Sequence, residues 1–550
     1  MSAGYKSDSI SGDLIKIIVV WLLANFWHSF FFGFYSDDWV YSTFCINEAY
    51  NKLDLAGRIH FYLTGSQGRP ILAFAYFATS FLSPLKSPLY WQLVNSLYVL
   101  ISALVLWLFG RELLRYMAIS TKYAAVASVI WLLSPWMLGS VSWSTTAPTL
   151  LSMIFFAMAG YYFFRSENQG RRSLILPSIF ILLSSLSYEA FYFQYLAFPG
   201  VFYIVSKNRK ASLKILTVFT LVQLLPLIWN RISPFIFTNA IHKTFNPYWH
   251  LTFVANVISL PYALIASCSY NSAYLLVILI FLVFVFIHER NKIREHFKRY
   301  GSVIVLLALC IIISMGIYAI AGYTVWGMGS RGRTLLTAGF WIPLMAVVLY
   351  SPVSKLMPDR KNMIVMVYLA LVFLGIAQFQ KSSDWIRAWR IQKAVIANLP
   401  TDKINSTSPD AVIIADLPFR YNDVSLFDTF WTINNQLNYG AMFCGITHSP
   451  KPLNRSYALG KGIIHPVNNT NWVNKWTGNE LIQHYTNNYN ELNNPIYNPQ
   501  TRTKASEAWF WQFESFSFTK IETGHTIVCN PVKNYDYWLT WLWAKYFKGK

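Results

Sequence analysis

Residues 14–34 read LIKIIVVWLLANFWHSFFFGF, and the next five residues are Tyr35-Ser36-Asp37-Asp38-Trp39. The first stretch is apolar and long enough to cross a bilayer as a helix, which takes about 20 residues. No small-residue cleavage site follows it, so we expect a first transmembrane helix and not a cleavable signal peptide. Two adjacent carboxylates come directly after the apolar core. We therefore expect this acid pair at the membrane surface, where ionisation is less costly than in hydrocarbon.

The composition of the whole chain is that of a membrane protein. Its 550 residues are 55% hydrophobic and 13% charged, and the mean hydropathy is +0.35. Soluble globular domains carry roughly 25% charged residues. The formal net charge of +21 does not call for a nucleic acid partner, because basic residues crowd the cytoplasmic loops of membrane proteins. We predict a polytopic α-helical protein whose partner is the lipid bilayer.

The apolar runs predict about eleven transmembrane helices. In chain order they are 14–34, 89–109, 123–138, 149–164, 173–187, 190–205, 215–229, 272–287, 303–321, 334–350 and 363–379. The run 71–82 is too short to span easily and predicts an interfacial or half-inserted helix. Residues 230–271 are expected to form a long outer loop that lies partly on the membrane.

Lysine and arginine residues set the predicted orientation. With the N-terminus inside, the inner segments hold 20 Lys and Arg, whereas the outer loops before residue 380 hold 8. An excess of this kind is typical of cytoplasmic segments. We therefore predict a cytoplasmic N-terminus and an external C-terminal part.

The chain divides into two predicted domains. Residues 1–379 form a transmembrane module, in which residues 35–69 are the first outer loop. Residues 380–550 are rich in Asn, Tyr and Trp, and about 170 residues suffice for one folded domain. Within it, the β-branched run Val412-Ile413-Ile414-Ala415 predicts a buried strand, so we expect a mixed α/β domain.

The five cysteines do not form a recognisable site. They are scattered and include no CxxC pair, so the sequence predicts neither a metal site nor a disulfide framework. Cys444 and Cys529 both lie in the predicted C-terminal domain. They could pair or remain free thiols.

The order of these parts resembles the GT-C glycosyltransferases: a first helix, an acid pair in the first outer loop, many further helices and a soluble C-terminal domain. Within that superfamily the chain is most similar to the bacterial Gtr-type glucosyltransferases, which modify O-antigen and convert serotype. The resemblance implies a sugar donor linked to undecaprenyl phosphate, glucose as that sugar, and a hydroxyl of an O-antigen repeat in lipopolysaccharide as the acceptor. It also implies a multi-pass protein of the bacterial inner membrane with a periplasmic C-terminal domain. The sequence requires no cofactor, although some GT-C relatives use a divalent metal with their loop acids.

Asp37 and Asp38 are the candidate catalytic residues. The resemblance implies that Asp37 takes the proton of the acceptor hydroxyl while the anomeric carbon is attacked in an inverting reaction. Asp38 then orients the acceptor or holds the loop, or the two roles are reversed. Trp39 is beside the pair, and its ring suits stacking on a sugar. The structural alternative is that both acids cap a helix or face solvent.

Arg331, Arg333 and Arg69 are the candidates for binding the donor phosphate, since the leaving group's growing negative charge needs cations. Arg331 and Arg333 belong to the stretch WGMGSRGR, whose glycines allow close backbone approach. Arg69 comes just before Pro70 at the end of the first outer loop. Arginine can bind a phosphate through two parallel hydrogen bonds. Interfacial arginines also snorkel without any ligand, and that alternative stays open for all three.

Tyr188, Glu189 and Trp143 are the remaining candidates for substrate binding. Glu189 follows Tyr188 at the outer end of an apolar run, where an acid is costly and often functional. It could bind sugar hydroxyls, or it could pair with an arginine such as Arg69 in a purely structural role. Trp143 lies in an uncharged loop that could line a sugar pocket or simply pack.

Other functions fit parts of the pattern. A polymerase or ligase of lipid-linked O-antigen usually lacks acids directly after the first helix and lacks a large external C-terminal domain. A transporter or flippase for lipid-linked sugars would show internal repeats and ionisable residues in mid-helix, and neither is evident in the sequence. In a scaffold protein the acids would have no chemical role. The leading prediction is therefore a membrane glycosyltransferase.

Overall fold

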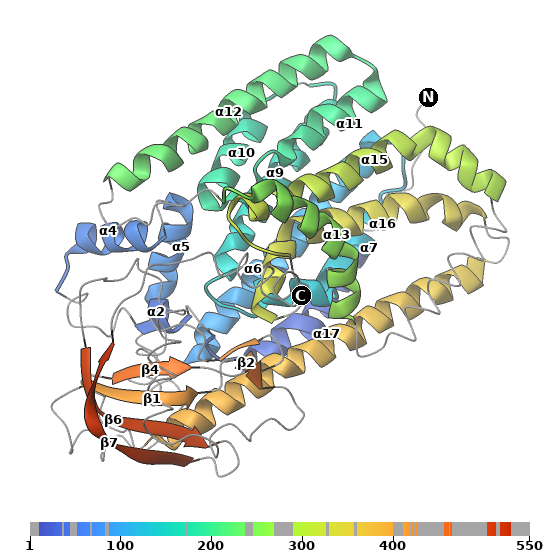
Figure 1. Cartoon of the computed structure of the whole chain (residues 1–550). Coiled ribbons are helices and arrows are strands. Elements are labelled where there is room, and N and C mark those ends of the chain that lie inside the picture. Colours follow the sequence, from blue (N-terminus) through green and yellow to red (C-terminus); the bar gives the residue numbers. More distant parts are fainter. Residues whose placement is uncertain are drawn as a thin grey trace, which may run out of the picture. The chain divides into compact units, whose positions relative to one another are not determined.

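The computed structural model describes the helical part of the chain and the strands that follow it (Figure 1). The described residues are 10–35, 38–43, 52–66, 69–82, 87–171, 173–236, 246–268, 290–325, 329–356, 360–399, 411–417, 420–421, 424–426, 456–460, 463–464, 503–512 and 517–529. The chain forms two compact units. The helical unit comprises Met1–Gly33, Asn47–Leu82 and Pro88–Trp385, and the sheet unit comprises Phe34–Ile46, Ser83–Ser87 and Ile386–Lys550.

The described part of the helical unit is built mainly from apolar helices. Its helices are α1 (Ile10–Trp21), α4 (Leu55–Gly65), α5 (Pro70–Ser80), α6 (Pro88–Tyr116), α7 (Tyr123–Leu132), α8 (Leu138–Val141), α9 (Leu150–Asn168), α10 (Ile175–Ser187), α11 (Ala197–Ser206), α12 (Arg209–Ile236), α13 (Trp249–Ser267), α15 (Arg290–Ile320), α16 (Leu336–Leu356) and the first part of α17 (Arg360–Ala397). Short π and 3₁₀ segments connect them, namely η1 (Leu22–Phe26), η2 (Trp27–Phe30), η5 (Pro135–Met137), η6 (Ala147–Thr149), η7 (Glu189–Phe191), η8 (Gln194–Leu196) and η10 (Gly329–Leu335).

Five helices of the described chain are long and apolar enough to cross a membrane. They are Ile10–Phe30, Pro88–Tyr116, Arg209–Ser233, Tyr300–Ile320 and Gly332–Leu349, and a bent pair, Tyr123–Leu132 with Pro135–Val141, would make a sixth. This is the architecture of a helical membrane protein, as the composition predicts. The count of eleven stays a prediction, since the expected span at 272–287 lies outside the described residues.

The predicted third span is broken instead of continuous. Helix α7 ends at Leu132, and the chain bends by 57° before η5 and α8. The cause is Pro135, which disfavours helical geometry at the residue before it. Ser134 accordingly has an extended backbone with ψ of 112°. The expectation of one helix over 123–138 is therefore wrong in its second half.

Two further segments differ from their predicted boundaries. Part of the expected outer loop 230–271 is helical, because α13 covers Trp249–Ser267 and packs against α15. Helix α17 runs on to Ala397, well beyond the expected end at residue 379. The short run 71–82 is a helix as expected, α5, and it buries Leu72, Ala73 and Tyr76 within the protein.

The core of the helical unit is a cluster of aromatic rings. Phe156 stacks on Phe198 with centroids 5.0 Å apart, and Phe109 stacks on Phe340 at 5.5 Å. Gly160 of α9 lets these rings approach, since a Cβ there would lie 2.4 Å from the ring of Phe109. Dense aromatic packing of this kind fixes α6, α9, α11 and α16 against one another.

Among its described residues, the sheet unit has helix α2 (Asp38–Thr43), the end of α17, and seven strands. One sheet has the order β4-β1-β6-β7, formed by Ser456–Gly460, Ala411–Leu417, Thr503–Gln512 and Ser517–Cys529. Strand β1 is parallel to both neighbours, whereas β6 and β7 are antiparallel. A second sheet has the order β3-β2-β5, formed by Val424–Ser425, Arg420–Tyr421 and Ile463–Ile464. The predicted strand at 412–415 is confirmed as β1, an inner strand of the larger sheet.

Candidate functional site

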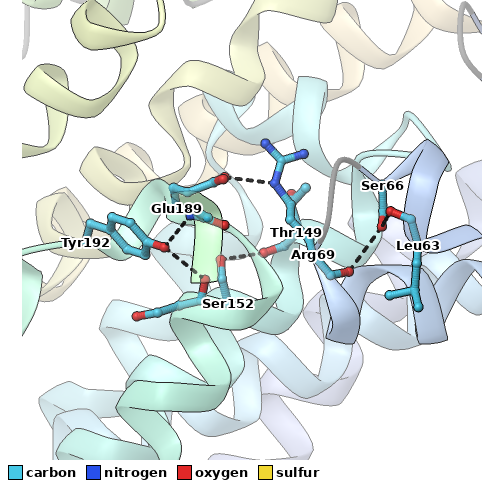
Figure 2. A network of polar contacts seen from close by, with 9 residues as sticks. Leu63, Ser66, Arg69, Thr149, Ser152, Glu189 and Tyr192 are labelled. Carbon is cyan, nitrogen blue, oxygen red and sulfur yellow. Dashed lines mark hydrogen bonds and ion pairs between the residues drawn. The ribbon is translucent and has the colours of Figure 1, made fainter. Parts of the chain in front are cut away.

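Arg69 and Glu189 form an ion pair in the helical unit (Figure 2). Arg69 is the residue before Pro70, which starts α5, and Glu189 starts the 3₁₀ turn η7 after α10. The Nε atom of Arg69 donates to Oε2 of Glu189 at 2.9 Å, and each side chain is 16% exposed. The structural alternative predicted for Glu189, pairing with Arg69, is therefore realised.

The ion pair uses the Nε atom of Arg69 (Figure 2). Only Nε bonds to the carboxylate, and within the described part of the chain no acceptor bonds to Nη1 or Nη2. The guanidinium also lies over the ring of Tyr188, 4.8 Å from its centroid. Burial alone would lower the pKa of Arg69, but the neighbouring Glu189 carboxylate raises it above its ordinary value. Arg69 is thus a permanently charged group held from one side.

Arg333 provides a second guanidinium in the same unit. It lies in η10 over the rings of Trp143 and Tyr323, with centroid distances of 4.9 and 5.5 Å. The carbonyl of Arg333 accepts a hydrogen bond from the Tyr318 hydroxyl at 3.2 Å, which fixes its backbone. Arg331 belongs to the same turn, but its side chain lies outside the described part of the structure.

Gly332 explains why this turn can pack so closely. A Cβ at Gly332 would lie 3.1 Å from the carbonyl oxygen of Trp136 and 3.3 Å from the amide nitrogen of Gly139. Gly332 thus lies close to the backbone of η5 and α8, which the lack of a side chain permits. This approach brings Arg333 onto Trp143.

Tyr188 connects the two arginines. Burial raises the pKa of its phenol, and both Arg69 and Arg333 act in the opposite direction. The two guanidinium groups, which are far apart in sequence, therefore act electrostatically on one side chain. The helical unit brings together five of the predicted site residues: Arg69, Arg333, Tyr188, Glu189 and Trp143.

Trp143 and the hydroxyl residues after it are buried, so the loop packs into the protein. Trp143 is 4% exposed, and its indole N–H has no hydrogen-bond partner within the described residues. A buried donor without an acceptor is unfavourable by about 1–3 kcal/mol. This N–H is therefore a candidate donor for a ligand oxygen.

Gln92 of α6 supports this loop and was not among the predicted site residues. Its Nε2 atom donates to the carbonyl of Gly33 at 2.7 Å, to the carbonyl of Ser142 at 3.2 Å and to Oγ of Ser144 at 2.9 Å. Asn95, one turn further on, donates to the carbonyl of Val141 at 2.8 Å. The sequence signal for Gln92 and Asn95 is an amide side chain inside an otherwise apolar span, where polar groups are often functional.

Asp38 and Trp39 belong to the sheet unit. Asp38 is buried, and its Oδ2 accepts from the amide of Tyr35 at 2.9 Å while its own amide donates to the Tyr35 carbonyl at 3.0 Å. These two bonds fix the start of α2, so Asp38 holds the loop, one of its predicted roles. Trp39 is also buried, and its indole donates to Oε1 of Gln392 at 3.0 Å. Asp37, the predicted base, lies outside the described residues.

Metal binding has no support from side chains in the described ranges. No three or more His, Cys, Asp or Glu residues gather there in a way that could hold an ion. Asp37 is not among those residues, so the question of a divalent metal at the acid pair stays open.

The chain was compared with protein-family models and with curated proteins, and neither comparison finds a match.

Proposed function

We propose that this protein is a membrane glycosyltransferase. It would transfer a sugar, glucose by resemblance, from a polyprenyl-phosphate donor to a hydroxyl of a cell-surface glycan such as O-antigen. In this proposal the chain crosses the bacterial inner membrane about eleven times, and the reaction occurs at the periplasmic face. The C-terminal α/β domain lies on that same side.

The observation that carries the proposal is the state of Arg69. Glu189 accepts from its Nε (Figure 2), Tyr188 lies against its face, and within the described residues no acceptor bonds to Nη1 or Nη2. A guanidinium that presents two parallel N–H donors matches two oxygens of a phosphate. Arginine–carboxylate pairs are frequently bidentate, whereas this pair uses one nitrogen of Arg69. Arg69 is therefore suited to bind the donor phosphate.

Arg333 supplies the second positive charge that the reaction needs. As the acceptor oxygen bonds to the anomeric carbon, the bond from that carbon to the phosphate oxygen breaks and its electron pair stays on the phosphate. Fixed cations stabilise this growing negative charge in the transition state. The indole N–H of Trp143, beside Arg333 and without a hydrogen-bond partner among the described residues, is a further donor for a phosphate or sugar oxygen.

Asp37 would take the proton that the acceptor hydroxyl loses. Asp38 is occupied in holding the loop through Tyr35, which favours Asp37 over Asp38 as the base. Trp39 bonds to Gln392, so its proposed contribution is to fix the acid pair and not to stack on a sugar.

Contacts inside the helical unit support the proposed orientation. Residues from segments predicted to be external meet one another, as in Arg69 with Glu189 and Arg333 with Trp143. Segments predicted to be cytoplasmic also meet, because Asn168 at the end of α9 donates to Glu112 near the end of α6 at 2.9 Å. Trp143 precedes the start of α9 and Asn168 lies at its end, so the two sets belong to opposite ends of this helix, as an alternating topology requires.

The test offers synthetic undecaprenyl-phosphate sugars one at a time to membranes that contain the protein. Asp37→Asn should abolish transfer to the glycan at normal protein levels. Asp54→Asn is the matched control, since Asp54 is in the same loop and caps α4 through the amide of Gly57 at 2.7 Å. Asparagine caps helices about as well as aspartate, so this variant should stay active. Full activity of Asp37→Asn, or no transfer from any donor, would refute the proposal.

A further inference from the structure

A second basic pocket lies at the opposite end of α6 and α9 from the candidate site. Its volume is about 380 Å³, and its lining includes Arg111 and Arg115 of α6, Arg165 of α9 and Ile10 of α1. Small-molecule sites commonly measure about 300–1,000 Å³, so a phosphate-bearing group can enter. The proposed orientation puts this pocket at the inner membrane surface.

Two matching stripes of side chains build the pocket. On α6, Trp107, Arg111 and Arg115 follow at intervals of four residues, and on α9 the same spacing relates Tyr161 to Arg165. Residues four apart share one face of a helix. Arg111 lies 5.0 Å from the ring centroid of Trp107, and Arg165 lies 5.5 Å from that of Tyr161. An aromatic ring thus holds each guanidinium in place.

Glu112 neutralises one of the three arginines. Arg115 donates to both of its carboxylate oxygens at 2.7 and 2.9 Å, and Asn168 donates to Oε2 at 2.9 Å. Within the described chain, Arg111 and Arg165 have no carboxylate in ion-pair distance. Three arginines against one glutamate leave the lining with a formal charge of +2.

We propose that this pocket binds a phosphate-bearing anion, the headgroup of an anionic phospholipid, between Arg111 and Arg165. Guanidinium groups recognise phosphate oxygens through directed hydrogen bonds. Basic pockets between transmembrane helices on the cytoplasmic side are suited to anionic lipid headgroups. Ile10, which is 52% exposed, adds an apolar edge on which an acyl chain can rest.

This inference does not depend on the proposed glycosyl transfer. Arginines in the last turn of a helix also complement its dipole, but that role needs neither a pocket nor aromatic partners. A soluble phosphate compound has the same anionic group as the lipid headgroup. The experiment therefore compares a phospholipid with inorganic phosphate directly.

The test measures thermal unfolding of the full-length purified protein in detergent, with added phosphatidylglycerol, phosphatidylcholine or inorganic phosphate. Arg111→Gln/Arg165→Gln is the pocket variant. Arg171→Gln/Arg209→Gln is the matched control, because these exposed arginines belong to predicted inner segments outside the pocket. Native mass spectrometry counts the lipids retained on each protein.

Phosphatidylglycerol should raise the unfolding midpoint of the wild type and the control more than phosphatidylcholine does. The pocket variant should lose this difference. Its apparent affinity for phosphatidylglycerol should be lower than that of the wild type by about tenfold or more, since a charged hydrogen bond contributes about 1.5–3 kcal/mol. An equal effect from inorganic phosphate alone would identify a soluble ligand as the source. Equal responses of pocket variant and control would overturn the proposal. If the double variant does not fold, the exposed Arg165→Gln alone must show the same loss.

Discussion

The Nε atom of Arg69 donates to Oε2 of Glu189 at 2.9 Å, across 120 positions of sequence. This single bond fixes the direction of the guanidinium and uses only its Nε atom. Of the two alternatives for Glu189, pairing with Arg69 is observed, and binding of sugar hydroxyls stays a prediction. The proposed binding of a phosphate by the terminal nitrogens of Arg69 can be tested directly.

Replacing Arg69 tests whether its two-nitrogen end binds phosphate. Arg69→Gln should lower kcat/KM for the polyprenyl-phosphate donor by about 10- to 100-fold, the equivalent of about 1.5–3 kcal/mol for a charged hydrogen bond. Arg69→Lys keeps the charge but loses the planar geometry, so its activity should be intermediate. Arg58→Gln, in the same outer loop, is the control and should act like the wild type. Equal activity of Arg69→Gln and wild type would contradict the assignment.

Replacing Glu189 separates positioning from binding. Glu189→Gln keeps an acceptor for Nε but removes the charge, and it should lower the free energy of unfolding by about 1–3 kcal/mol. Adding Arg69→Gln to this variant should restore part of the stability, because no lone buried charge remains. Activity should stay low in the double variant. If the double variant recovers both the stability and the donor KM of the wild type, the pair is purely structural. Unfolding in detergent measures the stability, and kinetics on the same variants measure the donor KM.

Gly332 offers a test of the close approach beneath Arg333. Gly332→Ala would place a methyl group 3.1 Å from the Trp136 carbonyl oxygen, and backbone cannot move aside as a flexible side chain can. We expect destabilisation of about 1–3 kcal/mol and a raised donor KM, since Arg333 would shift from Trp143. Gly301→Ala is the control. Its Cβ would meet only Phe297, at 3.8 Å, and alanine favours a helix. Similar thermal stability of the two variants would show that the turn is loosely packed.

The sequence predicts the membrane class and many helices because hydropathy reports burial in lipid directly. It places the strand β1 correctly from its β-branched residues. It also offers Arg69 as a partner for Glu189, because an acid at the end of an apolar run needs a counter-charge.

Pro135 is visible in the sequence, but the apolar residues on both sides favour one continuous span, so the bend was not predicted. The other features depend on packing between segments far apart in the sequence. Gln92 was missed because its meaning comes from three acceptors elsewhere in the fold, not from its neighbours. The stacking of Arg333 on Trp143 likewise joins segments about 190 residues apart, with no shared motif.

Gln92 provides the last test, which concerns the support of the uncharged loop. Gln92→Leu removes the donor to Gly33, Ser142 and Ser144 in a site that is 1% exposed. We expect a loss of about 1–3 kcal/mol in the free energy of unfolding, since buried acceptors then lose a hydrogen bond. Ser96→Ala is the control from the same helix, because the buried Ser96 hydroxyl has no partner within the described residues. Its removal should leave stability unchanged or raise it, and donor KM should change only in Gln92→Leu. If the two substitutions reduce stability equally, the loop does not depend on Gln92, and Trp143 must be held beside Arg333 by packing alone.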